Sequence, residues 1–532
     1  MKNSNTDVLV VGGSIGGCLA AYSAAKQKKK VILTEETDWI GGQLTSQGVP
    51  PDEHQWIEQT GCTATYRQFR EQIRSYYRDH YPLTEEAMQD PLLNPGEAWV
   101  SRLSHEPKVA LKVLENMLAP YINSGRIILL KGIKPVKAVV VDDKVREIKF
   151  FDSTKKEHRL VSFKAVVDAT ECGDVLPLAN VEYVLGAEGR EDTGETHASL
   201  EKDSQDMQSF TYVFAVDFVK NGHFIIEKPE DYDYWKTYIP PQHFNSLLNW
   251  HVGHQNDAGS VNTFTLFPDS SDNPALFTYR RAFSTALQQE KIYEGDVSLI
   301  NWPQNDYFFG SIIDVSPEVR EKHIHEAKQL SLSLLYWLQT EAPRDNDQKG
   351  YPELRLRKDV FDTEDGLAKY PYIRESRRIR AMYTIKEADV SIEDRKEAGI
   401  KEYQDSVGVG SYHLDLHTTV NSKTSMYIPT YPYEIPLRAI VPVRIRNLIP
   451  GCKNIGTTHI TNGCYRLHPT EWNVGEAAGC LASFMIDQNK SVQEIAADND
   501  LVYDFQVLLT NEGIQLHWPD DIKKEVLTPN RL

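Results

Sequence analysis

At 532 residues the chain is too long for a single hydrophobic core, so two or more domains are expected. Hydrophobic residues make up 40% and charged residues 25%, as in globular proteins, and the net charge of −18 argues against a nucleic-acid partner. Six scattered cysteines exclude a disulfide scaffold. The sequence shows no apolar stretch of signal-peptide or membrane-spanning length, which predicts a soluble, cytoplasmic protein without membrane contact.

The chain opens with the pattern strand, turn, helix, strand. Residues 7–11 (DVLVV) are a short apolar run that ends at two glycines, as in a buried parallel strand. An alanine-rich stretch at 15–28 predicts a helix, and residues 29–35 (KKVILTE) predict a second strand. The spacing is that of one β-α-β unit of a parallel sheet.

The elements predicted after this unit are helices and short strands with hairpin-like spacing. We expect helices at 62–82 and 107–124 and, between 126 and 170, short strands with hairpin-like spacing that form an antiparallel meander. Residues 200–430 are rich in aromatic side chains, and Ser316 followed by proline predicts a helix that runs to about Gln339. After residue 490 the chain should form two helical segments, the second ended by Gly513.

The turn after the first strand is typical of a phosphate-binding loop. Small residues are needed there because backbone N–H groups must approach a pyrophosphate at a helix N-terminus. Tight packing alone would also explain the glycines. The loop fits a GxGxxG frame with serine at the second glycine position and consists of Gly12, Gly13, Ser14, Ile15, Gly16 and Gly17.

Two later features favour a dinucleotide. Glu35 ends the second strand 23 residues after Gly12, close to the spacing of about 20 for the acidic residue that accepts hydrogen bonds from ribose hydroxyls. A second glycine pair, Gly41 and Gly42, precedes Gln43 and would let the chain pass close to a cofactor. Ordinary turn chemistry explains a lone glycine pair equally well.

Three segments together resemble FAD-dependent oxidoreductases of the glutathione-reductase type. They are VVGGSIGG…VILTEETDWIGGQLTSQG at 10–48, AVVDATECGD at 165–174 and NLIPGCKNIGTTHITNGCYRLHPTEWNVGEAAG at 447–479. NWPQNDY at 301–307, PYIRESRRIRAMYTI at 371–385 and GSYHLDLH at 410–417 are similar to segments of the FAD_oxidored group, which is largely bacterial. The group leaves the substrate open, since fold does not determine function.

The resemblance implies an α/β fold (α+β overall) with a Rossmann-like FAD-binding domain, an inserted antiparallel meander and a mixed β/α substrate domain. We expect the FAD-binding domain at 1–200 and 431–490, the substrate domain at 201–430 and a helical tail at 491–532. FAD would be bound non-covalently, in a monomer or homodimer. The implied cofactor residues are the loop residues Gly12, Gly13, Ser14, Ile15, Gly16 and Gly17, together with Glu35, Gly42, Gln43, Asp174 and Gly475, the last on a helix that starts near Trp472.

Catalysis by such a protein needs a base that removes a proton while hydride passes to flavin N5. His459 and His468 are the candidates, because histidine titrates near neutral pH, although each also suits a structural hydrogen-bonding role. Arg466 would hold an anionic substrate or stabilise reduced flavin. We assign no metal. The expected activity is oxidation of a polar small molecule, such as a sugar derivative, hydroxy acid or amino acid.

Several interpretations stay open at this stage. A flavin monooxygenase that uses NAD(P)H and oxygen, or a protein that binds FAD without catalysis, would share these motifs. The basic cluster at 374–380 either grips an anion or forms internal ion pairs, and the internal network is favoured. His413, Asp415 and His417 should share one strand face, opposite Tyr412, as part of a polar pocket. Residues 51–56 either border the flavin or form a surface turn, the simpler explanation.

Overall fold

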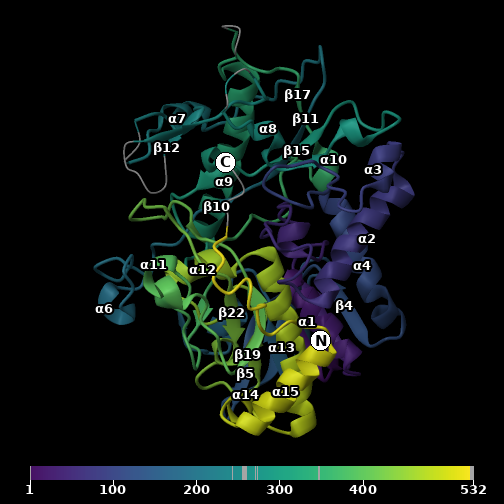
Figure 1. Cartoon of the computed structure of the whole chain (residues 1–532), viewed down its shortest axis with the longest axis vertical. Helices are drawn as coiled ribbons and strands as arrows, with labels where there is room; N and C mark the ends of the chain where they lie inside the picture. The colour runs from purple at the N-terminus through teal and green to yellow at the C-terminus, as the bar shows by residue number, and fades with distance from the viewer. Residues whose placement is uncertain are drawn as a thin grey trace.

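The computed structural model describes residues 2–241, 244–253, 260–269, 271, 273–344 and 348–527. The first and last thirds of the chain lie together in the lower part of Figure 1, and the teal middle segment forms the upper part. In the described part of the chain, no helix has both the length and the apolar character needed to cross a membrane.

A five-stranded parallel sheet forms the lower part. Its order is β23-β8-β2-β3-β4, so a strand from the last third of the chain lies beside strands from the first third. This arrangement confirms the predicted α/β fold with a Rossmann-type sheet. The strands are β2 (Val8–Val11), β3 (Val31–Glu35), β4 (Ile127–Lys131), β8 (Ala165–Asp168) and β23 (Leu448–Pro450).

Helices α1 (Ile15–Lys26) and α13 (His468–Gln488) pack tightly against each other beside this sheet. Glycines make the approach possible: a Cβ on Gly475 would lie 2.3 Å from the carbonyl oxygen of Gly16, and one on Gly479 would lie 2.3 Å from that of Ala20. Helix α13 begins at His468, earlier than the predicted start near Trp472. Gly475 therefore lies within the helix rather than at its N-terminus.

The antiparallel meander is present, but the first and last strands predicted between 126 and 170 are β4 and β8 of the parallel sheet. The meander consists of β5 (Ile133–Val141), β6 (Lys144–Asp152) and β7 (Glu157–Ser162). The polar N-terminus, expected only to lead into the first strand, forms strand β1 (Lys2–Asn5) and pairs in parallel with β7. A polar strand is stable there because it completes the edge of an existing sheet.

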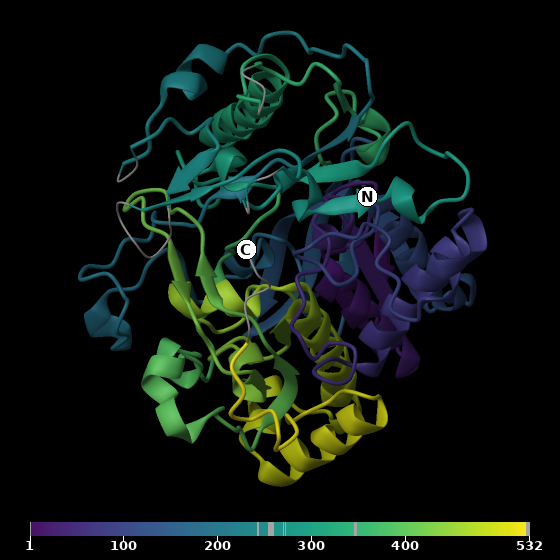
Figure 2. The same ribbon diagram turned by 45° about the horizontal axis from the view of Figure 1, so that its top comes forward.

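The middle segment has its own sheet and core. Its four strands have the order β14-β15-β11-β17, and α9 (Pro317–Thr340) lies on the side of the sheet away from the C-terminal helices (Figure 2). Helix α9 starts at the predicted Ser316 cap, whose hydroxyl accepts from the Val319 N–H at 3.3 Å. The strands are β11 (Phe214–Phe218), β14 (Arg281–Phe283), β15 (Val297–Ile300) and β17 (Leu354–Leu356).

The remaining predicted helices are confirmed as α2 (Ala64–His80), α4 (Pro107–Asn123), α14 (Val492–Ala496) and α15 (Asn499–Asn511). Gly513 has φ +86° just after α15, as expected of a helix stop. Short elements that carry site residues are β13 (Val261–Thr263), α8 (Leu276–Tyr279), β16 (Asp306–Tyr307), β20 (Leu414–Leu416), β21 (Met426–Ile428) and α12 (His459–Tyr465).

Candidate active site

The glycine-rich loop joins β2 to α1 at the carboxyl edge of the parallel sheet. Ser14 caps the helix, and its hydroxyl accepts a hydrogen bond from the Gly17 N–H at 3.1 Å. Gly12 has φ +94°, and a Cβ there would lie 2.3 Å from the carbonyl oxygen of Ala169. Serine at the second glycine position therefore keeps the loop compact while serving as the helix cap.

A cavity opens beside this loop. It lies where open α/β sheets bind their ligands, outside the carboxyl ends of the strands. Its wall is formed by the ends of β2 and β3, the second glycine pair and the segment after β8. The lining residues include Gly12, Ser14, Thr34, Glu35, Gly42, Ser46, Gln47, Thr170, Glu171, Asp174 and Tyr370.

Glu35 occupies the predicted position at the end of β3. Its carboxylate accepts hydrogen bonds from the backbone N–H groups of Gly13, at 2.8 Å, and Thr37, at 2.7 Å. Burial raises its pKa to about 7, despite these bonds. The carboxylate thus faces the loop and lines the cavity, where ribose hydroxyls would supply further donors.

Buried polar groups beside the loop lack hydrogen-bond partners within the protein. The Gln43 Oε1, Gln47 Nε2 and Glu171 Oε1 atoms are buried without one, so the site offers both donors and acceptors to a ligand. Gly42 has φ +48°, and a Cβ there would lie 2.3 Å from the Glu171 Oε1 atom, so glycine is needed for the chain to pass here. This mixture suits the ribityl, ribose and pyrophosphate groups of FAD.

Lys453 neutralises the acidic interior of this site. Its ammonium group is buried, pairs with Glu171 and lies 3.6 Å from Glu471. Glu171, Cys452 and Glu471 have the geometry of possible metal ligands, but Lys453 already supplies a positive charge there. We therefore interpret the group as a buried ion-pair cluster.

Two predicted cofactor residues have partners in the protein. Asp174 lines the cavity and forms an ion pair with Arg377 at 2.9 Å. Gly475 packs on Gly16 and supports the loop from behind, which accounts for its small size by packing. Its predicted contact with FAD remains an untested hypothesis.

His459 lies at the N-terminus of α12 in a buried ionic network. Its Nδ1 atom is 3.0 Å from the Glu375 carboxylate, which also pairs with Arg378. Burial lowers the pKa of His459, but Glu375 outweighs it and holds the pKa above its ordinary value. His459 is thus held in a buried ion-pair network, and it does not line the large cavity described below.

His468 is held by backbone groups on both sides of its ring. The Asp52 N–H donates to Nδ1 at 3.1 Å, and Nε2 donates to the Val49 carbonyl at 3.1 Å. Burial lowers the pKa of His468 to about 4. Since neither nitrogen is left to accept a substrate proton, the structure gives this side chain a positioning role, and its predicted role as a base stays untested.

Arg466 connects the cofactor site to a second cavity. Its guanidinium donates to the Tyr372 hydroxyl at 2.7 Å and the Asp415 carbonyl at 3.0 Å, and it lies 3.4 Å from the Asp415 carboxylate. Its own carbonyl accepts from Gln43 at 3.0 Å. Because Gln43 also contacts Glu471, which accepts from the Gly16 N–H at 3.2 Å, these bonds run from the phosphate loop to Asp415.

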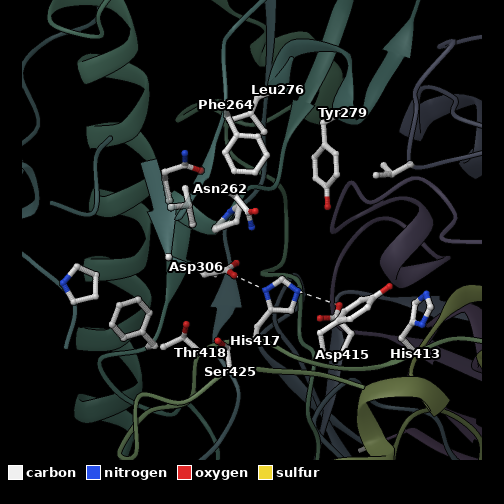
Figure 3. A pocket seen from close by; sticks show the side chains of 18 of the residues that line it. Asn262, Phe264, Leu276, Tyr279, Asp306, His413, Asp415, His417, Thr418 and Ser425 are labelled. Carbon is white, nitrogen blue, oxygen red and sulfur yellow. Dashed lines mark hydrogen bonds and ion pairs between the residues drawn. The ribbon is translucent and has the colours of Figure 1, made fainter. Parts of the chain in front are cut away.

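The second cavity measures about 1,560 Å³, open solvent included, and lies between the middle segment and the flavin-binding part. Figure 3 shows His417 near its centre, between Asp306 and Asp415. Its Nδ1 atom is 2.5 Å from Asp306, and its Nε2 atom is 3.4 Å from Asp415. Burial raises the pKa of Asp306, but Arg374 and His417 outweigh it and hold the pKa below its ordinary value.

Some sequence interpretations of this region need correction. Tyr412 lines the same cavity as His413, Asp415 and His417, because the strand covers only residues 414–416 and the predicted alternation does not extend to residue 412. The His413 ring lies against Tyr427, with ring centroids 4.5 Å apart.

Residues 51–56 do not form a surface turn. Asp52, Glu53 and His54 are buried, with exposed fractions of 5%, 4% and 1%. Asp52 lines the large cavity, where it pairs with Arg280 at 2.9 Å. The position of this segment after the glycine pair made it a candidate in the sequence. Its ionic partner, Arg280, lies far away in the chain and gave no local signal.

The basic cluster forms the internal ion pairs that the sequence favoured. Arg374 contacts Asp306 at 2.8 Å, Arg377 contacts Asp314 at 2.7 Å, and Arg378 pairs with Glu375. The cluster thus orients the carboxylates of both cavities. Asp306 was not singled out from the sequence, although the NWPQNDY segment at 301–307 carries it.

A family model described as FAD dependent oxidoreductase matches residues 7–508. Among curated proteins, no sequence matches this chain. The chain is 12% identical to L-proline dehydrogenase from P.horikoshii over 35% of this chain and 24% of that one, with a TM-score of 0.19. It is 14% identical to glycerol-3-phosphate dehydrogenase from Bacillus halodurans, crystallised with FAD, over 40% of each chain, with a TM-score of 0.22.

A flavin-dependent monooxygenase, PieE, in complex with FAD and substrate, is 12% identical over 41% of this chain and 36% of that one, with a TM-score of 0.25. The chain thus spans less than half of the length of each of these three structures. At these scores the three likenesses add nothing to the assignment, which is supported by the family model.

Proposed function

Because the chain belongs to the family of FAD-dependent oxidoreductases, we propose that it oxidises a polar small molecule bound in the large cavity beside His417. The observation that carries this proposal is the run of contacts from the Gly16 N–H through Glu471, Gln43 and Arg466 to Asp415. It links the predicted cofactor site to the polar cavity, as a shared reaction centre requires.

The cavity supplies a base. When bound, FAD accepts a hydride from the donor carbon, so the proton of the donor hydroxyl or amine must pass to another group. His417 suits this task because Asp306 holds its Nδ1 and thereby orients the ring. The imidazolium that forms on proton uptake is stabilised by Asp306 and by Asp415, at 3.4 Å from Nε2.

Arg466 acts through its neighbours in this proposal. It fixes Asp415 through the carbonyl and carboxylate oxygens, and it holds the Tyr372 hydroxyl on its other side. Its guanidinium is buried, with an exposed fraction of 2% for the residue. Arg466 therefore positions the acidic side of the cavity and carries the charge that balances Asp415.

Anaerobic reduction of the purified, FAD-loaded protein tests the proposal. Candidate donors of several classes and NAD(P)H are added separately, and bleaching of the flavin absorbance is recorded. Bleaching by a polar donor without NAD(P)H is the expected result. Consumption of NAD(P)H that a substrate stimulates, without bleaching by any donor alone, would instead support the monooxygenase alternative. A protein that takes up FAD but reacts with neither would support a non-catalytic role.

A further inference from the structure

The large cavity combines carboxylates with aromatic and apolar side chains. Figure 3 shows Phe264 and Leu276 at one end and Thr418 and Ser425 at the other, with the row of Asp306, His417 and Asp415 crossing between them. The Tyr279 side chain points into the cavity with its hydroxyl toward the side of Asp415. A ligand here would meet both acceptor oxygens and aromatic surface.

Among the described residues, four carboxylates line the cavity, and each is paired with an arginine from outside the lining. The pairs are Asp52 with Arg280 at 2.9 Å, Glu53 with Arg70 at 2.8 Å, Asp306 with Arg374 at 2.8 Å and Asp415 with Arg466 at 3.4 Å. The carboxylates thus remain hydrogen-bond acceptors while their charge is balanced within the protein.

Charged ligands fit this arrangement poorly. Within the described part of the chain, no lysine or arginine lines the cavity, so an anion would meet acceptor oxygens without a countercharge. A cation would have to compete with arginines that are already in place. Neutral hydroxyl groups, in contrast, can donate to the paired carboxylates at no cost in charge.

Aromatic side chains favour a ligand with flat apolar faces. The C–H groups of a sugar ring carry partial positive charge and pack on the electron-rich faces of aromatic rings. The cavity is open to solvent on one side, so a ring can enter it and lie against these side chains. Its aromatic lining consists of Phe264, Tyr279, Phe308, Tyr412 and Tyr427.

We propose that the electron donor is a neutral carbohydrate, a sugar or a glycoside. Its hydroxyl groups would donate to the paired carboxylates, and its C–H faces would pack on the aromatic side chains of the lining. This inference rests on the proposed oxidation in the same cavity. In the step itself, a ring hydroxyl becomes a carbonyl: its proton passes to His417, and the hydrogen on the same carbon leaves as hydride for the bound flavin. The donor thus loses one hydride, which carries two electrons, and one proton, which His417 takes up.

A matched panel of probes tests the inference on the FAD-loaded protein. Calorimetry measures binding and flavin absorbance measures anaerobic reduction with D-glucose, cellobiose and methyl β-D-glucoside, compared with L-lactate, L-alanine and glucose 6-phosphate. We expect a neutral sugar to bind and to reduce the flavin at least tenfold faster than any charged probe. Failure of all three neutral sugars to bind overturns the inference.

The two proposals fail in different ways. If L-lactate or L-alanine reduces the flavin and no sugar does, the substrate class is wrong and the proposed oxidation stands. If a neutral sugar binds but neither it nor any other donor reduces the flavin, the carbohydrate site stands and the proposed oxidation falls. Bleaching by NAD(P)H alone contradicts the proposed oxidation as well.

Two variants examine the cavity wall directly. Phe264→Ala should weaken sugar binding at least tenfold while the FAD content of the protein is unchanged. Thr418→Lys should weaken sugar binding and increase binding of glucose 6-phosphate, because it adds the missing positive charge. Tyr503→Ala, at a tyrosine that is 67% exposed, is the control and should leave both affinities unchanged. Unchanged sugar affinity in Phe264→Ala and Thr418→Lys would contradict the proposed site.

Discussion

The two cavities of this protein are built in opposite ways. The cofactor cavity is built largely from backbone: glycines let segments that are far apart in the chain approach closely, as at Gly12 beside Ala169 and Gly16 beside Gly451. The substrate cavity is formed by side chains from distant segments, and its carboxylates depend on arginines up to 228 residues away, as in the pair of Asp52 and Arg280. Backbone geometry thus dominates the first cavity, and side-chain charge dominates the second.

The strongest test of the backbone-built cavity is Gly16→Ala. A Cβ at this position would lie 1.7 Å from the Gly451 carbonyl oxygen, so α1 must move away from β23. We expect the FAD content, measured as flavin absorbance per protein, to fall below a tenth of the wild-type value. Gly125→Ala is the control for a strained but unobstructed glycine: its φ is +71°, yet a Cβ there meets nothing within 4 Å, so the FAD content should stay normal. Normal FAD content in Gly16→Ala would show that the loop tolerates side-chain bulk.

His417→Asn tests the side-chain-built cavity. Loss of a catalytic base lowers rates about 10²- to 10⁴-fold, so flavin reduction should slow by at least 100-fold with unchanged FAD content. His251→Asn, at an exposed histidine that lines the same cavity, should reduce the rate by less than threefold. Equal rates for His417→Asn and wild type would remove His417 from the mechanism.

Arg374→Met tests whether charge pairing supports the substrate cavity. Removal of one partner from a buried ion pair costs about 3–5 kcal/mol, because Asp306 loses its guanidinium and keeps only His417 and the Thr211 hydroxyl as partners. Urea unfolding at pH 7 measures the loss. Lys108→Met, which breaks an exposed pair with Asp362, should cost at most about 1 kcal/mol. Similar losses in both variants would mean that the buried pair has no special weight.

The same pair has a defined pH dependence. The pKa of Asp306 in the folded protein lies below its ordinary value, so its stabilising contribution is present above the unfolded pKa of about 3.9 and is lost as the pH falls through the folded pKa. The stability difference between wild type and Arg374→Met should therefore shrink below pH 4. A difference that grows with acidification would contradict this assignment.

Glu35→Gln gives the smallest expected effect. The pKa of Glu35 is raised to about 7 by burial, so the FAD-free protein gains stability from its protonated form below the unfolded pKa of about 4.3 and loses it as the pH rises through 7. Glutamine does not titrate. The free energy of unfolding of the variant minus that of the wild type should therefore be larger at pH 8 than at pH 5, as measured by urea unfolding.

An exposed glutamate provides the comparison for this last prediction. Glu321→Gln, on the outer side of α9, should follow the wild-type pH dependence. Parallel curves for wild type and Glu35→Gln would mean that the Glu35 carboxylate does not titrate in this range.

The sequence by itself predicted the parallel sheet, the meander, the main helices and the glycine-rich loop, because each depends on neighbours close in the chain. Glu35 was placed correctly for the same reason: a strand end has a regular distance from the loop that precedes it. The start of α13 at His468 was missed, since the proline after it also suits a loop.

Only the tertiary structure decided which polar residues meet. His459 and His468 were equivalent candidates in the sequence, but Glu375 holds the first in an ion pair and backbone groups occupy both nitrogens of the second. His417 gained its central place from Asp306, 111 residues away, and from the short strand that carries Asp415. Spacing along a chain encodes backbone geometry, whereas the pairing of buried charges depends on which distant segments the fold brings together.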